Sequence, residues 1–120
     1  MKRVVAVLGA SENPNAYSHK AVKLLSQKGF EVFAVGKKSG KIDDILIYTN
    51  IDHSMKIDTV TLYLSPENQI HYYDWIQSIQ PKKVIFNPGT ENPELQSILE
   101  KSHINYENAC SLVLLNLNQF

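Results

Sequence analysis

The sequence predicts an α/β fold, and two observations carry that prediction. Short apolar runs alternate with amphipathic segments along the 120 residues, in the order β-α-β-β-β-α-β-α-β. The first run, residues 3–8, is apolar, rich in β-branched side chains and typical of a strand covered on both faces. Strands and helices in this order form a mainly parallel sheet with right-handed crossovers. We therefore expect a Rossmann-like open sheet of five to six strands with helices on both faces.

The first half of the chain supplies the remaining central strands and one helix. Residues 17–28 predict an amphipathic helix, with four apolar residues on one side and mostly lysines on the other, and Gly29 ends it. Residues 36–44 are expected to be a flexible loop. Further strands are predicted over residues 31–35, 45–48 and 59–64.

The second half contains the helix with the clearest signals. Ser65-Pro66-Glu67 places a hydroxyl at the N-cap, proline at the first helical position and an acid in the first turn. An apolar face with helical spacing follows and ends before Pro81; it consists of Tyr72, Trp75, Ile76 and Ile79. A strand over residues 84–86, a helix that starts at Asn92-Pro93-Glu94 and a sixth strand over residues 104–106 complete the order. The apolar tail, residues 112–115, is expected to pack on the sheet, with a homodimer contact as the alternative.

Composition restricts the class of protein. The apolar fraction of 43% and only five glycines and five prolines argue against a disordered or fibrous chain. Twelve basic residues balance twelve acidic ones, so no long-range field attracts nucleic acid. The single cysteine favours a reducing compartment, and no apolar run suits an export signal or a membrane span. We expect one cytoplasmic domain, residues 1–120, that binds neither nucleic acid nor membrane.

A ligand site is expected at the carboxyl ends of the parallel strands, where ligands collect in open α/β sheets. If the first strand is central and the strand over residues 59–64 lies beside it, the loops that follow these two strands flank the crevice. Both loops lead into helix N-termini, which favour an anion. The four loops at this edge are residues 9–17, 36–40, 65–69 and 87–92.

The first loop resembles a phosphate loop only in part. A dinucleotide fingerprint has three glycines, whereas this loop has Gly9 alone. Gly9 lets the backbone pass close to a diphosphate, Ser11 can donate a hydroxyl, and Ser18 is a good N-cap residue. An ordinary strand-to-helix turn explains the same residues, and that alternative stays open here.

The residues after the second strand discriminate better between ligands. An NAD enzyme usually carries an acid there, but this chain has Gly36-Lys37-Lys38. Two lysines disfavour NAD and suit either NADP or the 3′-phosphorylated adenosine of coenzyme A, with a solvated lysine pair as the alternative. Further along, Asn87-Pro88-Gly89-Thr90 predicts a tight type II turn with Gly89 at positive φ.

Several motifs together resemble the small single-domain CoA-binding proteins, which are similar to the nucleotide-binding domain of the succinyl-CoA synthetase α subunit. The resemblance spans residues 3–115 and rests on Gly9-Ala10-Ser11, Asn13-Pro14, Ser18, Ser65-Pro66-Glu67, Asn87-Pro88-Gly89-Thr90-Glu91-Asn92 and Cys110. It implies a domain that holds coenzyme A or an acyl-CoA. Many relatives carry an arginine near the position of Tyr17, whereas the only arginine of this chain is Arg3.

The resemblance also implies which residues meet the ligand. Contacts to the diphosphate are implied for Gly9, Ala10, Ser11, Asn13 and Ser18, and Lys37 is placed near the phosphorylated ribose. Ser65 and Pro66 would border the adenine and pantetheine path, with Pro88 and Gly89 on its far wall. The complete set of candidate cofactor-binding residues is Gly9, Ala10, Ser11, Asn13, Tyr17, Ser18, Gly36, Lys37, Lys38, Ser65, Pro66, Gln69, Asn87, Pro88 and Gly89.

No arrangement of residues in the sequence predicts catalysis or a metal site. The four histidines are scattered, and no nucleophile elbow, P-loop or paired-carboxylate motif appears. We therefore expect a binding module rather than an enzyme. The alternatives are an NADP-dependent reductase completed by an oligomer and the nucleotide-binding subunit of a split acyl-CoA ligase. Cys110 is expected to be an inert buried thiol; alternatively it lies near the pantetheine end and forms a mixed disulfide with CoA.

Overall fold

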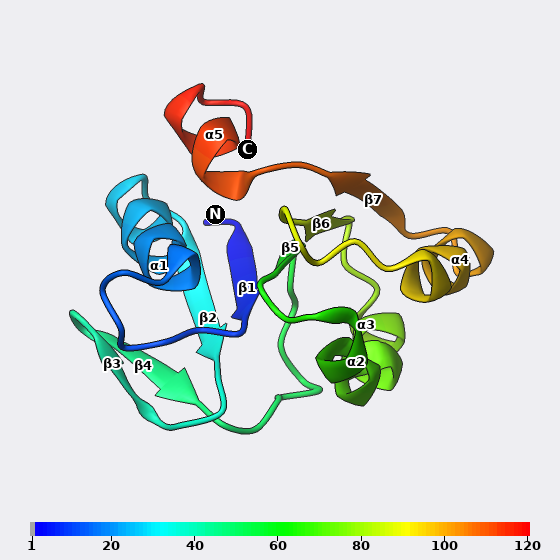
Figure 1. Cartoon of the computed structure of the whole chain (residues 1–120), viewed down its shortest axis with the longest axis horizontal. Coiled ribbons are helices and arrows are strands. Elements are labelled where there is room, and N and C mark those ends of the chain that lie inside the picture. The colour runs from blue at the N-terminus through cyan, green and yellow to red at the C-terminus, as the bar shows by residue number, and fades with distance from the viewer. Residues whose placement is uncertain (1) are drawn as a thin grey trace.

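The computed structural model describes residues 2–120 and contains one seven-stranded sheet of Rossmann-like α/β type, as predicted (Figure 1). The strand order across the sheet is β3-β4-β2-β1-β5-β6-β7, and every neighbouring pair is parallel except β3 and β4. The strands are β1 (Val4–Leu8), β2 (Glu31–Val35), β3 (Gly40–Ile42), β4 (Ile45–Tyr48), β5 (Thr59–Leu62), β6 (Lys83–Phe86) and β7 (Asn105–Asn108).

Helices cover both faces of the sheet because strand side chains alternate between the faces. Val5 and Val7 of β1 belong to the core under α1 and α5, whereas Ala6 and Leu8 belong to the core under α3 and α4. Among residues 2–120 no charged residue is classed as buried, and Trp75 is the largest of the fully buried side chains. The helices are α1 (Tyr17–Gln27), α2 (Pro66–Gln69), the 3₁₀ turn η1 (Ile70–Tyr72), α3 (Tyr73–Ile79), α4 (Pro93–Lys101) and α5 (Ser111–Asn116).

Three expectations about elements need correction. Residues 36–44 are not simply a loop, because β3 pairs antiparallel with β4 and brings the strand number to seven rather than five or six. The helix expected from Ser65 to Pro81 is interrupted by η1. Ser18 is not an N-cap: α1 begins at Tyr17 with Ala16 as its N-cap, so Ser18 is buried inside the first turn.

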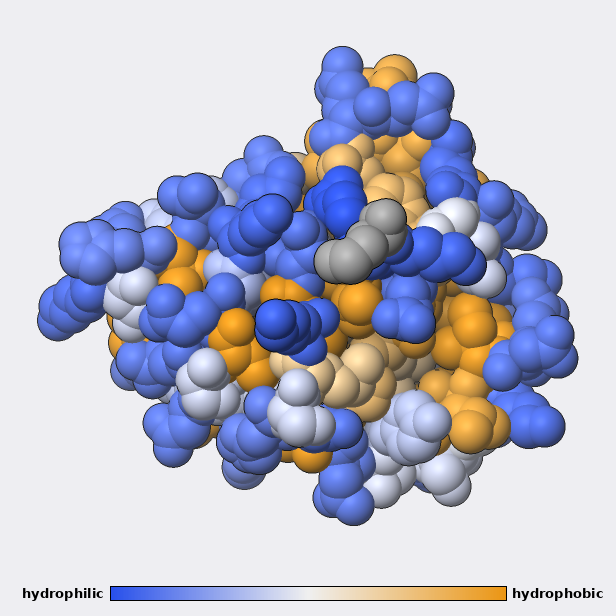
Figure 2. All heavy atoms as spheres, turned by 180° about the vertical axis from the view of Figure 1, so that it is seen from behind, coloured by the Kyte–Doolittle hydropathy of each residue, from blue (hydrophilic) through white to orange (hydrophobic). Residues whose placement is uncertain are grey.

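The apolar tail packs on the sheet, as expected, and does so as the helix α5. Leu115 is buried in the core between α1 and the sheet, while Val113 and Leu117 stay more than half exposed. From behind, hydrophobic residues are visible across the middle of the molecule and hydrophilic residues cover most of the rim (Figure 2). The homodimer contact stays a prediction.

Arg3 ties the amino-terminal edge of the sheet together. Its guanidinium donates to Asp58 Oδ1 at 3.0 Å, to Thr59 Oγ1 at 3.1 Å and to the Phe120 carbonyl oxygen at 2.9 Å. The same group lies 5.2 Å from the centre of the Phe30 ring and 5.6 Å from that of Phe120. One side chain thus joins β1, β5 and the C-terminal segment.

Arg3→Ala should lower the free energy of unfolding by about 1–2 kcal/mol, because it leaves the half-buried Asp58 carboxylate without its charged donor. Arg3→Lys should lose less, since an ammonium keeps the charge but not the fork of donors. Urea denaturation of the three proteins tests this. Equal stability of the wild type and Arg3→Ala would contradict it.

Asp58 should make the fold sensitive to acid. Burial raises its pKa, but the hydrogen bonds from Thr59 and Arg3 and the charges of Arg3 and Lys82 outweigh burial and lower the pKa below the ordinary 3.8. The ionised carboxylate therefore stabilises the fold above about pH 4, and this contribution is lost as the pH falls through the lower folded pKa. Asp58→Asn should flatten the loss of stability below about pH 4, measured by urea denaturation at a series of pH values.

Candidate functional site

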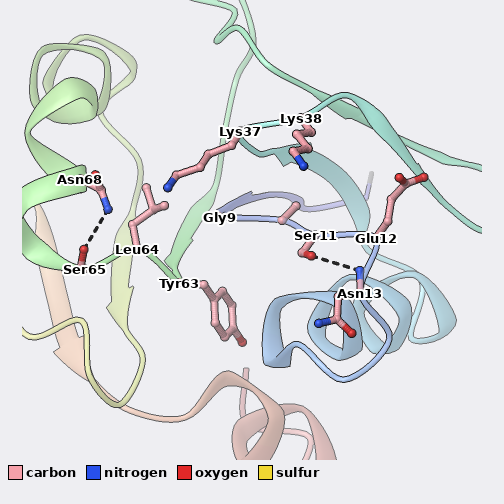
Figure 3. A pocket seen from close by; sticks show the side chains of 11 residues that line it. Gly9, Ser11, Glu12, Asn13, Lys37, Lys38, Tyr63, Leu64, Ser65 and Asn68 are labelled. Carbon is pink, nitrogen blue, oxygen red and sulfur yellow. Dashed lines mark hydrogen bonds between the residues drawn. The ribbon is translucent and has the colours of Figure 1, made fainter.

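A pocket lies where the sequence predicted a ligand site, at the carboxyl ends of the central strands. β1 sits between β2 and β5, and the connection after β1 leads toward one edge of the sheet whereas the connection after β5 leads toward the other. A pocket of about 570 Å³ opens there, which we call the phosphate pocket (Figure 3). It is lined by Gly9, Ala10, Ser11, Glu12, Asn13, Lys37, Lys38, Tyr63, Leu64, Ser65 and Asn68.

The loop after β1 offers backbone donors that the fold does not use. The N–H groups of Gly9 and Ala10 both donate to the Val35 carbonyl oxygen at 2.9 Å, which fixes the loop against β2. Within residues 2–120, the N–H groups of Ser11 and Glu12 donate to no other residue. The N–H groups of Ser11 and Glu12 are therefore free to donate to a ligand, whereas those of Gly9 and Ala10 are already engaged, and the diphosphate contacts implied for Gly9 and Ala10 stay a prediction.

The N-terminus of α1 adds a second set of donors to the same loop. Asn13 forms the preceding turn, since its carbonyl oxygen accepts from the Ala16 N–H at 3.0 Å. Ala16, Tyr17 and Ser18 line a neighbouring pocket of about 350 Å³, which we call the middle pocket. The free N–H groups of a helix's first turn and its positive dipole end favour an anion. The arrangement can hold phosphate oxygens between the loop and the helix.

Lys37 and Lys38 face this loop from the end of β2. Both are exposed and line the phosphate pocket, and Lys37 extends across it toward Leu64 and Asn68 (Figure 3). Neither ammonium forms a salt bridge with the described residues. Their charge is therefore available to a phosphorylated ligand.

Glu12 connects the two loops that form the pocket. Its Oε2 accepts from the Lys41 N–H at 2.9 Å, and its side chain packs on Gly40, where no Cβ could fit without displacing it. This contact holds the start of β3, and with it the lysine-bearing turn, beside the loop after β1. Glu12 was not among the predicted site residues.

Glu12→Ala should reduce the preference for CoA over dephospho-CoA several-fold, because the turn that carries Lys37 and Lys38 loses its anchor. Glu12→Gln is the matched control: it also removes the negative charge but keeps an oxygen that accepts from Lys41. Calorimetric titration of both ligands tests the pair. Equal ligand preference in the two variants would assign any effect to charge alone.

Tyr63 lines the phosphate pocket, the middle pocket and a third pocket, which we call the end pocket. Its N–H donates to the Leu8 carbonyl oxygen at 2.9 Å, just after β5 ends, and its ring points away from the lysines (Figure 3). Burial raises the pKa of its hydroxyl to about 12, so this group stays neutral at physiological pH. The middle pocket continues from Tyr63 to the turn formed by Pro88 and Gly89, whose φ is +91° as predicted.

Some predicted site residues make contacts within the fold, and their contact with a ligand stays a prediction. Gly36, Pro66 and Gln69 line none of these three pockets. Gln69 is fully buried, and its amide donates to the carbonyl oxygens of Leu64 and Thr90, both at 2.8 Å. Asn87 is also buried and bridges β5 to the start of α5. Gly36 lets the second loop approach the Ala10 carbonyl oxygen closely, a packing role.

Cys110 is half-buried, so the expectation of a buried thiol was wrong, while its inertness stays a prediction. It lines the end pocket together with Tyr17, Tyr63, Asn87, Pro88 and Leu112. Elsewhere, residues 2–120 hold no cluster of three or more metal-ligating side chains. No helix in this part of the chain is long and apolar enough to cross a membrane.

Comparisons with known proteins identify the family and support the fold. The model of a family described as CoA binding domain matches residues 3–116. An uncharacterized protein with a known crystal structure shares 39% sequence identity with this chain. The match covers 100% of this chain and 99% of the other, with a TM-score of 0.94. A conserved hypothetical protein from Pyrococcus furiosus is 29% identical, with a TM-score of 0.80 over 92% and 97%.

A part of a larger enzyme shares the fold. A dinucleotide-forming acetyl-coenzyme A synthetase from Ca. Korarchaeum cryptofilum is 16% identical, with a TM-score of 0.70 over 86% of this chain and 25% of that one. No curated protein matches the chain.

Proposed function

Because the chain belongs to the CoA-binding domain family, we propose that it binds coenzyme A along the phosphate and middle pockets and catalyses no reaction on it. The proposal rests on one observation: free backbone amides and a pair of lysines line the same pocket. The unused amides of Ser11 and Glu12 lie opposite Lys37 and Lys38. The first pair suits a diphosphate, and the second suits the additional phosphate on the ribose.

Different parts of coenzyme A lie in the phosphate pocket and in the middle pocket. In this proposal the 3′-phosphate lies at the lysines and the diphosphate lies on the loop after β1 and the N-terminus of α1. Pantetheine then runs along the middle pocket past Tyr63 to Pro88 and Gly89. This direction of the ligand follows from the phosphate pocket, which holds both the lysine pair and the free amides of Ser11 and Glu12.

Calorimetric titration with CoA, dephospho-CoA, NAD and NADP tests the proposal. We expect CoA to bind more tightly than dephospho-CoA, which lacks the phosphate opposite Lys37, and NAD to bind weakly. Heat from NADP with none from CoA at millimolar ligand would overturn the assignment.

NADP is the second candidate, because the same lysine pair suits its 2′-phosphate. If NADP were the true ligand, a reductase completed by an oligomer would follow. Quenching of NADPH fluorescence on mixing, with displacement by NADP but not by CoA, would favour that alternative.

A further inference from the structure

The end pocket differs from the other two in the chemistry of its walls. Its volume is about 240 Å³, and its walls carry two tyrosine rings, a proline, a leucine, a thiol and one amide. The lining residues are Tyr17, Tyr63, Asn87, Pro88, Cys110 and Leu112. None of these residues is an aspartate, glutamate, lysine, arginine or histidine.

Two polar side-chain groups of these walls are buried, the Asn87 amide and the Tyr63 hydroxyl, and only the amide has its hydrogen bonds filled within the fold. The Asn87 amide donates to Thr61 Oγ1 at 2.7 Å and to the Leu62 carbonyl oxygen at 2.8 Å, and its oxygen accepts from the Ser111 N–H at 2.8 Å. The Tyr63 hydroxyl is buried, has no hydrogen-bond partner among the described residues and, with a pKa of about 12, is neutral. A mainly hydrocarbon group that carries one acceptor, such as a thioester carbonyl, therefore suits this pocket better than a charged group.

The end pocket lies at the far end of the path proposed for coenzyme A. It shares Tyr17, Tyr63 and Pro88 with the middle pocket, and the middle pocket shares Gly9, Ser11 and Ser65 with the phosphate pocket. A ligand with its phosphates on the loop after β1 and its pantetheine in the middle pocket thus brings its sulfur end to the mouth of the end pocket.

We propose that the end pocket holds the acyl group of a short-chain acyl thioester of coenzyme A, so that the protein prefers acylated CoA to free CoA. This inference rests on the proposed function, because it uses the direction in which CoA lies. A free thiol leaves the apolar walls exposed to water, whereas an acyl chain covers them. Each buried methylene contributes ~0.8 kcal/mol, which corresponds to about fourfold in affinity.

Calorimetry with CoA, acetyl-CoA and butyryl-CoA tests the inference, in the presence of a phosphine that keeps every thiol reduced. We expect butyryl-CoA to bind about 15-fold more tightly than acetyl-CoA, because its chain has two more methylenes to bury, and CoA to bind more weakly than either. Leu112→Asp should abolish that gain and leave the affinity for CoA unchanged, because a carboxylate then faces the acyl chain. Val113→Asp is the matched control, since Val113 is the next residue of α5, is exposed and lines none of the three pockets.

The outcomes separate the two proposals. Equal affinity for all three ligands, or a preference that survives Leu112→Asp, would overturn the acyl pocket and leave CoA binding intact. A protein that binds none of them would overturn the proposed function itself.

Alkylation of Cys110 locates the acyl chain independently, because Cys110 is the only cysteine in the sequence. At saturating ligand, butyryl-CoA should slow its reaction with iodoacetamide several-fold more than CoA does. Equal protection by the two ligands would place the acyl chain elsewhere and contradict the inference.

Discussion

Gly9→Ala is expected to abolish measurable CoA binding and to destabilise the protein by about 2–4 kcal/mol. Gly9 has a φ of +100°, and a Cβ there would lie 3.0 Å from the backbone carbon and oxygen of Tyr63. Positive φ costs a residue with a side chain roughly 1–2 kcal/mol, and the contact with Tyr63 adds about 1–2 kcal/mol more. A Cβ at residue 9 is fixed to the backbone and the Tyr63 atoms that it meets are backbone atoms, so no side-chain rotation can remove the clash. The loop after β1 must instead move away from β5, which changes the shape of the phosphate pocket.

Gly29→Ala is the matched control for this substitution. Gly29 also has positive φ, +91°, but a Cβ there would meet nothing within 4 Å. It should therefore lose only the conformational part of the stability, about 1–2 kcal/mol, and bind CoA as the wild type does. Urea denaturation and calorimetry measure both quantities for both variants. Full CoA affinity in Gly9→Ala would place the ligand outside this pocket.

Lys37→Glu is expected to weaken CoA about tenfold and dephospho-CoA no more than about threefold. Only CoA carries the 3′-phosphate, and a charged hydrogen bond to it contributes about 1.5 kcal/mol. A carboxylate at the same place repels that phosphate instead. Raising the salt concentration should reduce the difference between the ligands, since the Lys37 side chain is exposed.

Lys56→Glu is the control for net charge. It makes the same change in total charge at an exposed residue that lines neither the phosphate nor the middle pocket. It should leave the affinities for both ligands unchanged. Equal losses of CoA and dephospho-CoA in Lys37→Glu would contradict the placement of the 3′-phosphate.

The sheet could be predicted because a strand that is buried on both faces has a continuous apolar sequence. Residues 4–8 are apolar without alternation, and the structure buries them between two layers of helices at the centre of the sheet. β3 has no such apolar sequence, since it has only three residues and buries only Ile42. Its pairing with β4 depends on the turn between them, which apolar periodicity does not report.

The edge that bears the site could also be predicted, because parallel strands place their following loops together. Ser11, Lys37 and Ser65 come from three separate loops and line one pocket, as that argument requires. Their contacts with a ligand remain a prediction. Gln69 was predicted as a site residue because it lies in one of the loops at this edge. Its side-chain amide instead donates to two backbone carbonyl oxygens. These hydrogen bonds depend on tertiary contacts, which sequence spacing does not reveal.

Tyr63 and Glu12 could not be found from sequence spacing, for two different reasons. Tyr63 was counted within the strand predicted over residues 59–64, but β5 ends at Leu62, and the ring then turns into the site. A tyrosine at the carboxyl end of a strand beside the switch point was the available signal. Glu12 acts through Lys41, and no local pattern links these two residues.

A crystal structure of the protein with bound CoA tests the central claim most directly. We predict diphosphate oxygens within hydrogen-bonding distance of the Ser11 and Glu12 N–H groups and a 3′-phosphate beside Lys37. Pantetheine should run past Tyr63 toward Pro88. A ligand whose diphosphate lies away from the loop after β1, or whose 3′-phosphate points away from Lys37, would contradict the account.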